Sequence, residues 1–297
     1  REDVHLRGRA WPPMPKASPW VMTHPCLCLT LQLGAIHYAL DEKTGVATCT
    51  LNRPERLNSW TSELGSEYFN ALDRAAESAD VKAIVVTGAG RGFCSGADMD
   101  MLQGIGARDG EEETPVELRT ERHDYALTIP KPVIAAINGA CAGLGFVHAM
   151  MCDIRFAAAG AKFTSAFARR GLIAEHGVSY MLPRVVGPSN ALDILMSGRV
   201  FMAEEAKEMG VVSRVLPPDE LVTATVEYAR ELGRYSAPWS MAQMKNQVWS
   251  QLDMARTESL EESNRVMAQS LKRPDFKEGV ASFVEKRDPA FEPVVGS

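Results

Sequence analysis

The chain of 297 residues is 45% hydrophobic and has a net charge of −6, so it can bury a sizeable core in one large domain, with or without an appendage. Its acidic balance does not indicate a basic face for nucleic acid, and no stretch reaches the roughly 18 apolar residues of a membrane-spanning helix. The cysteines lack paired spacing apart from Cys26 and Cys28, which favours a reducing cytoplasm, and we expect neither a nucleic-acid nor a membrane partner.

Residues 1–33 are rich in proline between Trp11 and Pro19 and have no helical or alternating hydrophobic period. Pro25 to Leu33 is only weakly similar to a secretory signal, which needs a charged start, an apolar centre and a small-residue cleavage site. We expect residues 1–33 to be a flexible extension, or an over-extended start of translation, rather than a functional arm.

Strands and helices alternate from residue 34 onwards. Ile36–Leu40 and Val46–Leu51 are predicted as a hairpin, and Thr61 or Ser62 as the cap of a helix that runs to about Ser78. A polar surface loop is expected over 103–114. The further predicted strands are 83–87, 133–137, 153–158, 162–165 and 211–215, and the further predicted helices are 115–128, 178–183, 190–197, 203–210, 219–234, 237–253, 257–271 and 275–286.

This order of elements predicts an α/β fold with a separate helical subdomain at the C-terminal end. The expected organisation is an extension over 1–33, a core over 34–215 and a helical region over 216–297. Periodicity alone does not distinguish a spiral of strands from a doubly wound sheet.

Two buried strands each lead into a glycine-rich turn. Val133–Ile137 precedes the turn 138–145, after which a helix starts, and Ala83–Thr87 precedes the turn 88–96. A strand, a glycine turn and a helix start expose backbone N–H groups at the positive end of a helix, and such donors suit an oxygen that gains negative charge. The alternative is a pair of tight turns that need glycine only for a positive φ.

Several segments resemble the crotonase superfamily, which is the enoyl-CoA hydratase/isomerase family, and they match it in order over about residues 34 to 291. The matching segments are NRPERLNSW (52–60), FCSGAD (93–98), PKPVIAAINGACAGLG (130–145), MCDIRFAA (151–158), GLIAEHG (171–177) and FVEKR (283–287). The resemblance implies a ββα spiral of two packed sheets, with C-terminal helices that cover the pocket and build a homotrimer or hexamer. It also implies an acyl-CoA thioester substrate, with no metal or redox cofactor.

The resemblance also implies roles for individual residues. The backbone N–H groups of Ala97 and Leu144 would hold the thioester oxygen. The hydratases of the family use two glutamates, and the corresponding residues here are Val147 and Phe167, which cannot move a proton. Glu175 stands where the isomerases of the family place their catalytic carboxylate, and we expect Leu172 and Ile173 to bury it. The alternative for Glu175 is a surface residue that caps the next helix.

The residues that the resemblance places around the substrate come from several segments. They are Arg53, Arg56, Asn58, Ser95, Gly96, Asp98, Met99, Gly143, Val147 and Phe167, with Phe283 and Lys286 reaching the CoA of a neighbouring subunit. For Lys286 alone, a solvated charge on a helix is the better interpretation.

Other features of the sequence give weaker indications of a functional site. Phe93 replaces the last glycine of a dinucleotide fingerprint, and Cys94 is expected to be a small buried hydrophobe. His148 and His176 lack metal-ligand spacing and are expected to be core or supporting residues, and His123 is expected on a solvated helix face.

The sequence therefore favours a Δ3,Δ2-enoyl-CoA isomerase in which Glu175 moves the proton. The alternatives are an enoyl-CoA hydratase of fatty-acid β-oxidation, another acyl-CoA reaction such as hydrolysis or carbon–carbon cleavage, and an acyl-CoA-binding protein without catalysis.

Overall fold

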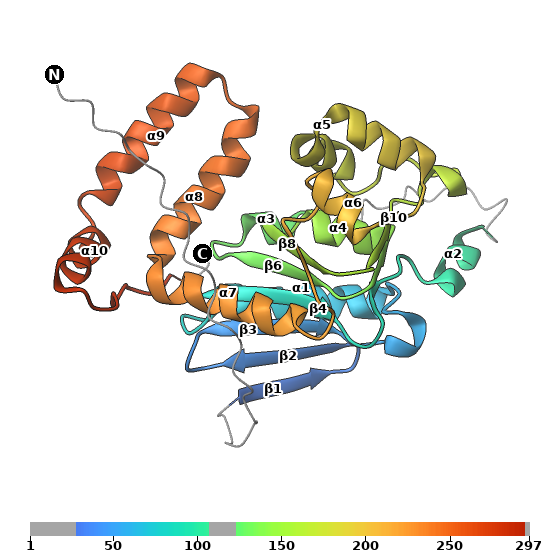
Figure 1. The fold of residues 1–297 in the computed structure, drawn as a ribbon, viewed down its shortest axis with the longest axis horizontal. Helices are drawn as coiled ribbons and strands as arrows, with labels where there is room; N and C mark the ends of the chain where they lie inside the picture. The colour runs from blue at the N-terminus through green and yellow to red at the C-terminus, as the bar shows by residue number, and fades with distance from the viewer. Residues whose placement is uncertain (1–27, 107–122, 295–297) are drawn as a thin grey trace.

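The computed structural model describes residues 28–106 and 123–294, and these form two β-sheets surrounded by helices (Figure 1). The larger sheet has seven strands. In pairing order they are β1 (Cys28–Leu33), β2 (Ile36–Asp41), β3 (Val46–Leu51), β4 (Ala83–Gly88), β6 (Val133–Ile137), β8 (Ile154–Ala158) and β11 (Arg214–Leu216). The smaller sheet has four strands, β10 (Phe201–Met202), β9 (Lys162–Thr164), β7 (Ala140–Ala142) and β5 (Gly92–Cys94).

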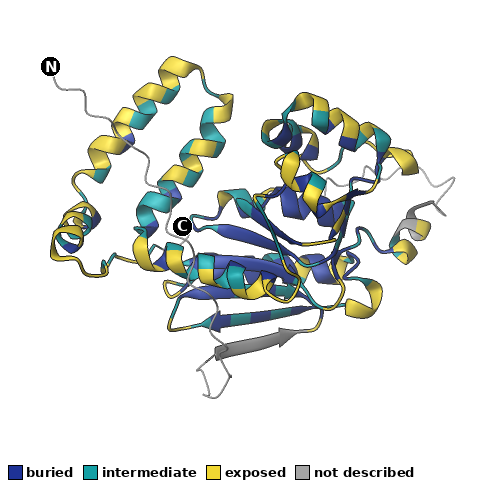
Figure 2. Cartoon of the chain, viewed as in Figure 1, coloured by how far each residue is buried: buried dark blue, intermediate teal, exposed yellow. Residues whose placement is uncertain are grey.

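The centre of the large sheet is the core of the molecule. β4 and β6 pair in parallel, and every residue of β6 and all of β4 except Gly88 are buried, so both faces of these strands are covered. Helix α7 (Leu221–Tyr235) packs on β3, β4, β6 and β8, and α1 (Ser62–Glu77) packs on β2 and β3. Figure 2 shows the buried residues concentrated in this layer.

The predicted hairpin and its following helix are confirmed. β2 pairs antiparallel with β3, with Ile36 opposite Leu51, and the side chain of Thr61 caps α1 by accepting a hydrogen bond from the Leu64 amide. The predicted N-terminal boundary is wrong by one strand, because residues 28–33 pair with β2 as β1. Proline and the lack of an alternating pattern obscured this strand, and residues 1–27 lie outside the described part of the chain.

Both glycine-rich turns contain a short strand that the sequence did not predict. β5 and β7 pair with each other in parallel, and β7 continues the ladder to β9. These strands have glycines because the chains approach very closely: a Cβ built on Gly139 would lie 2.0 Å from the carbonyl oxygen of Arg91. Glycine lowers strand propensity, which is why the pattern indicated loops.

The remaining elements follow the predicted order with shifted ends. Helix α5 (Val178–Ser197) contains a break at Gly187, whose φ of 77° and ψ of 160° separate the two predicted helices. β11 begins three residues later than predicted, because the apolar Val211 and Val212 are buried ahead of it rather than in it. Of the predicted helix 115–128, only α3 (Tyr125–Thr128) is described. The other helices are α2 (Met99–Gly106), α4 (Leu144–Met150), α6 (Ala203–Glu208), α8 (Pro238–Ser250), α9 (Arg256–Ser270) and α10 (Pro274–Glu285).

The C-terminal helices divide into two groups. α7 covers the large sheet, whereas α8, α9 and α10 extend away from it (Figure 1); α9 and α10 are largely exposed and α8 is mostly of intermediate burial (Figure 2). A boundary at residue 216 therefore separates α7 from the sheet that it covers. Lys245 joins α8 to the sheet, because its ammonium lies 2.7 Å from the Asp153 carboxylate and donates to the carbonyl oxygens of Ala126 and Lys131.

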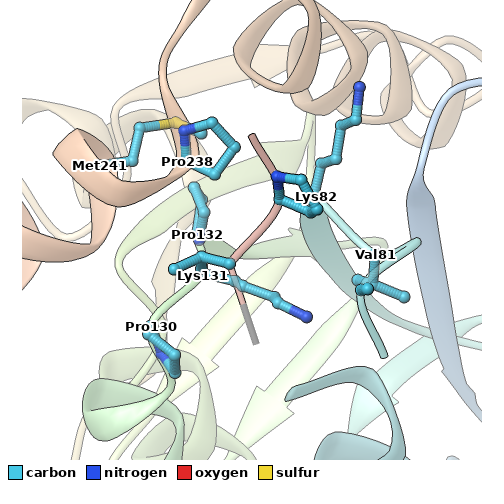
Figure 3. A pocket seen from close by; sticks show the side chains of 10 residues that line it. Val81, Lys82, Pro130, Lys131, Pro132, Pro238 and Met241 are labelled. Carbon is cyan, nitrogen blue, oxygen red and sulfur yellow. The ribbon is translucent and has the colours of Figure 1, made fainter. Parts of the chain in front are cut away.

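A shallow indentation lies where the start of α8 meets the segment before β6 (Figure 3). Proline rings and the stem of Lys131 line it, and the Lys131 ammonium donates to the carbonyl oxygens of Ala75 and Ser78. It is a packing feature between helix and sheet and contains none of the candidate site residues. No helix in the described part of the chain is both long enough and apolar enough to span a membrane.

Candidate active site

The two glycine-rich turns meet at Gly96 and Gly143. Both residues have a positive φ, 99° and 49°, which L side chains adopt rarely. A Cβ built on Gly96 would lie 3.1 Å from the carbonyl oxygen of Ala142 and 3.6 Å from the Cα of Gly143. The two turns therefore touch through their backbones. This contact brings the next residues, Ala97 and Leu144, to the same edge of the small sheet.

The amide of Ala97 is directed away from its neighbouring segment. Trp60 donates to the carbonyl oxygen of Gly96 and accepts from the amide of Asp98, so in this parallel bridge the N–H of Ala97 points to the opposite side. Leu144 is the first residue of α4, and its amide therefore has no partner inside the helix. Among the described residues, neither amide donates to another backbone group outside the regular elements. Contact of either amide with a thioester oxygen stays a prediction.

Close packing fixes the positions of these two amides. A Cβ on Gly145 would lie 2.2 Å from the carbonyl oxygen of Cys94, and one on Gly88 would lie 2.2 Å from that of Gly92. Side chains cannot occupy these positions without moving β5 or α4. The donors thus rest on the rigid interior of the fold.

The two positions that correspond to the hydratase glutamates are apolar and buried. Val147 on α4 is fully buried, and Phe167 is 5% exposed. Neither can accept or deliver a proton.

Glu175 lies in the segment 171–177, which precedes α5. Its side chain is 31% exposed, and the expectation that Leu172 and Ile173 would bury it is wrong, because these two side chains are 40% and 79% exposed. The carboxylate does not cap α5, whose N-cap residue is Gly177 and which has no side-chain cap. It lies instead beside His176, with Glu175 Oε2 3.9 Å from His176 Nε2. Glu175 is thus a partly accessible carboxylate with an imidazole beside it.

Three histidines gather behind this carboxylate. His148 is 2% exposed and its ring is stacked on Trp60, with 3.9 Å between centroids. His148 Nε2 lies 3.3 Å from His123 Nδ1, and the His123 and His176 rings are 3.9 Å apart. The expected solvated position of His123 is therefore wrong, while His148 is the core histidine that was predicted.

The sequence carries one signal for this cluster that was missed. His148 follows Leu144 by four residues on α4, so the two lie on one face of the helix. A histidine on the same face as a candidate amide donor points to the site.

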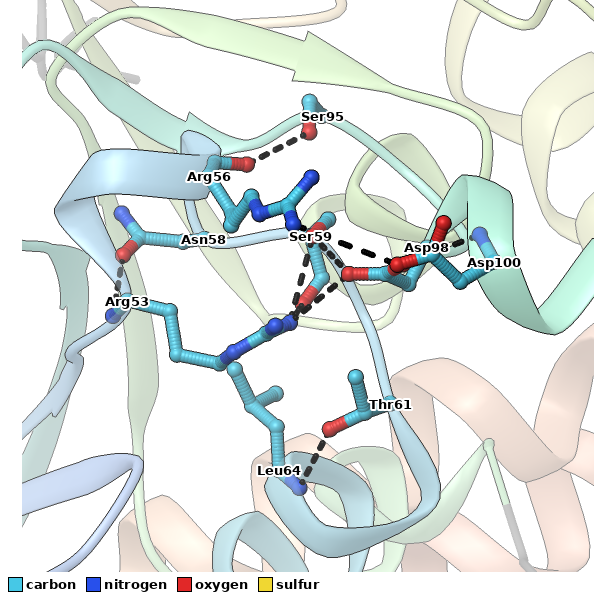
Figure 4. A network of polar contacts seen from close by, with 9 residues as sticks. All are labelled: Arg53, Arg56, Asn58, Ser59, Thr61, Leu64, Ser95, Asp98 and Asp100. Carbon is cyan, nitrogen blue, oxygen red and sulfur yellow. Dashed lines mark hydrogen bonds and ion pairs between the residues drawn. The ribbon is translucent and has the colours of Figure 1, made fainter.

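The segment 53–60 is tied to the first glycine turn by a polar network (Figure 4). Asp98 accepts from Ser59 Oγ at 2.7 Å and pairs with Arg53 Nη1 at 3.1 Å. The Ser59 hydroxyl, the Asp100 amide and Arg53 together hold the pKa of the Asp98 carboxyl below its usual value. Asn58 is fully buried and donates to the carbonyl oxygens of Ala89 and Gly92.

These contacts show how the predicted CoA-binding residues of this segment are held. The polar atoms of Asn58 and Asp98 hold the turn in place, and a contact from either residue to CoA stays a prediction. Arg56 and Met99 lie at the rim of the candidate site. The Arg56 side chain is 60% exposed, and Met99 is 56% exposed. Ser95 lies beside Arg56, and its hydroxyl donates to the Arg56 carbonyl oxygen. Contacts from these three to CoA stay a prediction.

Phe283 and Lys286 lie far from this rim within one chain. They lie on and at the end of α10, on the side of the molecule opposite α2 (Figure 1). Phe283 is 86% exposed. They do not contribute to the site of their own chain, and a role at a neighbouring subunit stays a prediction.

Comparison with known proteins places this site in a family. The sequence model for enoyl-CoA hydratase/isomerase matches residues 41–293. A probable enoyl-CoA hydratase, echA12 of Mycobacterium bovis, is 36% identical over 254 residues, covering 83% of this chain and 89% of that protein. The 1,2-epoxyphenylacetyl-CoA isomerase of Escherichia coli is 34% identical over 263 residues, covering 83% of this chain and 95% of that protein.

Solved structures agree with the sequence comparison. A putative enoyl-CoA hydratase from Streptomyces coelicolor A3(2) superposes with a TM-score of 0.80 at 31% identity, covering 95% of this chain and 99% of that one. The enoyl-CoA hydratase EchA12_1 from Mycobacterium marinum is 45% identical, with a TM-score of 0.62 over 72% of this chain and 96% of that one. The protein is thus an enzyme with the crotonase fold. It belongs to the enoyl-CoA hydratase/isomerase family.

Proposed function

We propose that the protein isomerises the double bond of an enoyl-CoA, converting a Δ3 to a Δ2 thioester through an enolate. The observation that carries this proposal is that Glu175 is an accessible carboxylate, while Val147 and Phe167 remove the two acids of a hydratase. One carboxylate suffices for a 1,3-proton shift, because it can take a proton from C2 and return one at C4.

Each step has a group to perform it. Glu175 takes the C2 proton, and the electron pair of the C–H bond moves to the thioester oxygen. The amides of Ala97 and Leu144 donate to that oxygen as its charge grows, and each such donor lowers a barrier by about 3 kcal/mol. Protonation at C4 then shifts the double bond into conjugation with the carbonyl group.

A hydratase is the second candidate. The echA12 relative is named a probable enoyl-CoA hydratase, and the imidazoles near Glu175 could take part in activating water. The Escherichia coli relative is named a 1,2-epoxyphenylacetyl-CoA isomerase, which is a different isomerisation, so the names of these relatives do not support double-bond isomerisation over hydration.

We also propose that CoA enters only as part of the substrate, that no metal or redox cofactor is needed, and that the enzyme acts as a homotrimer or hexamer in the cytoplasm. The chemistry supports a reaction without a metal or redox cofactor, since one carboxylate can move the proton and two amides can stabilise the charge on the thioester oxygen. The exposed apolar residues Phe283 and Val284 on α10 support an assembly.

The test is a paired assay with trans-3- and trans-2-enoyl-CoA, following product mass and the conjugated double bond. Glu175→Gln is compared with Glu208→Gln, which changes an exposed glutamate on α6. We expect the first variant to lose about 10²- to 10⁴-fold in turnover and the second to lose nothing. Water addition to the 2-enoyl ester at a comparable rate would favour the hydratase instead.

A further inference from the structure

Glu175 and three histidines form one continuous chain of contacts. Glu175 lies 3.9 Å from His176, the His176 ring lies 3.9 Å from that of His123, and His123 Nδ1 lies 3.3 Å from His148 Nε2. These groups come from three parts of the chain, which are the segment 171–177, the turn two residues before α3, and α4. This array of contacts runs from the partly exposed carboxylate of Glu175 to the buried ring of His148.

The buried end of this array stays neutral. Burial first, and then the neighbouring His123 and His176, lower the pKa of His148 well below its usual range. A neutral His148 shares one hydrogen with His123, because one of the two facing nitrogens donates and the other accepts. The tautomer of His123 is thereby coupled to that of a ring that cannot reach solvent.

The exposed end of the array is held by a constrained backbone. His176 has a φ of 54° and is followed by Gly177 with a φ of 79°. A non-glycine residue in this region costs about 1 kcal/mol or more and persists where its surroundings require it. Here the conformation accompanies a ring contact with His123 and an ion-pair distance to Glu175.

The cluster is not arranged as a metal site. In the described part of the chain, no three His, Cys, Asp or Glu residues are placed to hold a metal ion. Among the described residues, the His123–His148 pair contacts the rings of Trp60, Tyr68 and Phe69 and the imidazole of His176. Glu175 lies at the exposed end of the array.

We propose that His176, His123 and His148 exchange protons with Glu175, so that the proton taken from the substrate is not the one returned. This inference rests on the proposed function. Glu175 takes the proton as the C2–H bond breaks and passes it to Nε2 of His176 through one solvent molecule, because the two atoms are 3.9 Å apart. His176 exchanges it with His123 and solvent, and returns a solvent-derived proton to Glu175 for C4. No oxidant or other reactant is needed, since only protons move.

The first test measures deuterium in the product formed from a 3-enoyl-CoA in D2O, early in the reaction. Wild-type enzyme should place solvent deuterium at C4 in most turnovers. His123→Phe keeps a ring beside Phe69 and removes both nitrogens, and should lower the incorporation severalfold. His37→Gln is the control, because His37 lies on β2 and contacts Asn52, not a member of the array. Unchanged incorporation in His123→Phe would overturn the proposal.

A second measurement separates this proposal from the isomerase assignment. Nitrogen-15 NMR of the imidazoles reports their titration without any turnover, in the free enzyme and with butyryl-CoA bound. Glu175→Gln should move the titration midpoints of His176 and His123 and leave that of His37 in place. If the enzyme shows this coupling but does not isomerise the substrate, the proposed array stands and the proposed reaction is contradicted. If the titration midpoints do not respond to Glu175→Gln, the proposed proton exchange along the array is contradicted.

Discussion

The two halves of the proposed site, an oxyanion half and an acid–base half, are built in different ways. The oxyanion half consists of backbone amides set between strands so close that a single added carbon at Gly145 would lie 2.2 Å from a carbonyl oxygen. The acid–base half has Glu175 and His176 on an exposed segment, where Ile173 is 79% exposed and His176 has a positive φ. The first half is built from the core of the fold, whereas this segment of the second half lies at its surface. The choice of reaction therefore lies with Glu175 and the histidines near it, together with the apolar Val147 and Phe167.

The largest effect is expected from Gly145→Ala, which tests whether the oxyanion half is rigid. The added methyl group must displace β5 or α4, so we expect a loss of about 3 kcal/mol in the free energy of unfolding together with most of the activity. Denaturant unfolding and the enoyl-CoA assay measure the two effects. Gly279→Ala on α10 is the matched control, because its added Cβ would meet only Phe291 at 3.7 Å. An active, stable Gly145→Ala enzyme would show that the donor half is not rigid.

A smaller effect is expected from Asp98→Asn. The buried carboxylate loses its charge beside Arg53, which should cost about 1–2 kcal/mol of stability near pH 7. The folded pKa of Asp98 lies below its ordinary 3.8, so its ionised form stabilises the fold above about pH 4 and this contribution disappears as pH falls through the folded pKa. The stability difference between wild type and variant should therefore narrow in acid. A constant difference at every pH would contradict this account.

The buried histidine predicts a third, pH-dependent effect. Because the folded pKa of His148 is depressed, the unfolded chain binds a proton that the folded chain does not, and stability falls as pH drops below about 6.5. The slope from this one group reaches at most about 1.4 kcal/mol per pH unit. His148→Phe should keep the ring packing on Trp60 and flatten the curve between pH 7 and 5. Equal slopes in the two proteins would mean that His148 titrates normally.

The smallest effect is expected from Ile173→Ser. This side chain is mostly exposed, so the free energy of unfolding should change by less than about 0.5 kcal/mol. Thermal unfolding beside wild type measures the difference. A loss as large as that of Gly145→Ala would show that the acid–base half is also packed into the fold.

The alternation of strands and helices and the two glycine-rich turns could be predicted from the sequence for a physical reason, whereas the spiral arrangement was implied by the family resemblance. Buried strands such as Val133–Ile137 are continuous apolar runs, and glycines such as Gly143 mark the turns where backbones touch. The short strands β5 and β7 escaped prediction because their glycines are a consequence of contacts between segments far apart in the chain. β1 escaped because it pairs at an edge and has no strong alternating pattern.

The acid–base half was predicted less completely. Glu175 was singled out because it lies in a segment that matches the family. Its partial exposure was not predicted, because Leu172 and Ile173 are apolar and their sequence does not indicate that they face outward. The His123–His148 contact joins residues 25 positions apart on separate elements, and spacing along the chain contains no signal for such a pair. Only the four-residue step from Leu144 to His148 could have directed attention to it.

The ammonium of Lys245 has a consequence for dissecting this protein. It is the counter-ion of Asp153, a carboxylate that also holds the first amide of β6 and the indole of Trp249. Burial raises the pKa of Asp153 and lowers that of Lys245, so each charge is tolerated inside the molecule because the other is there. A fragment that ends before α8 would leave Asp153 as an unpaired buried acid at the root of the central strand. The helical tail is therefore not a detachable module, and the sheet and α8 have to be expressed, and to fold, as one piece.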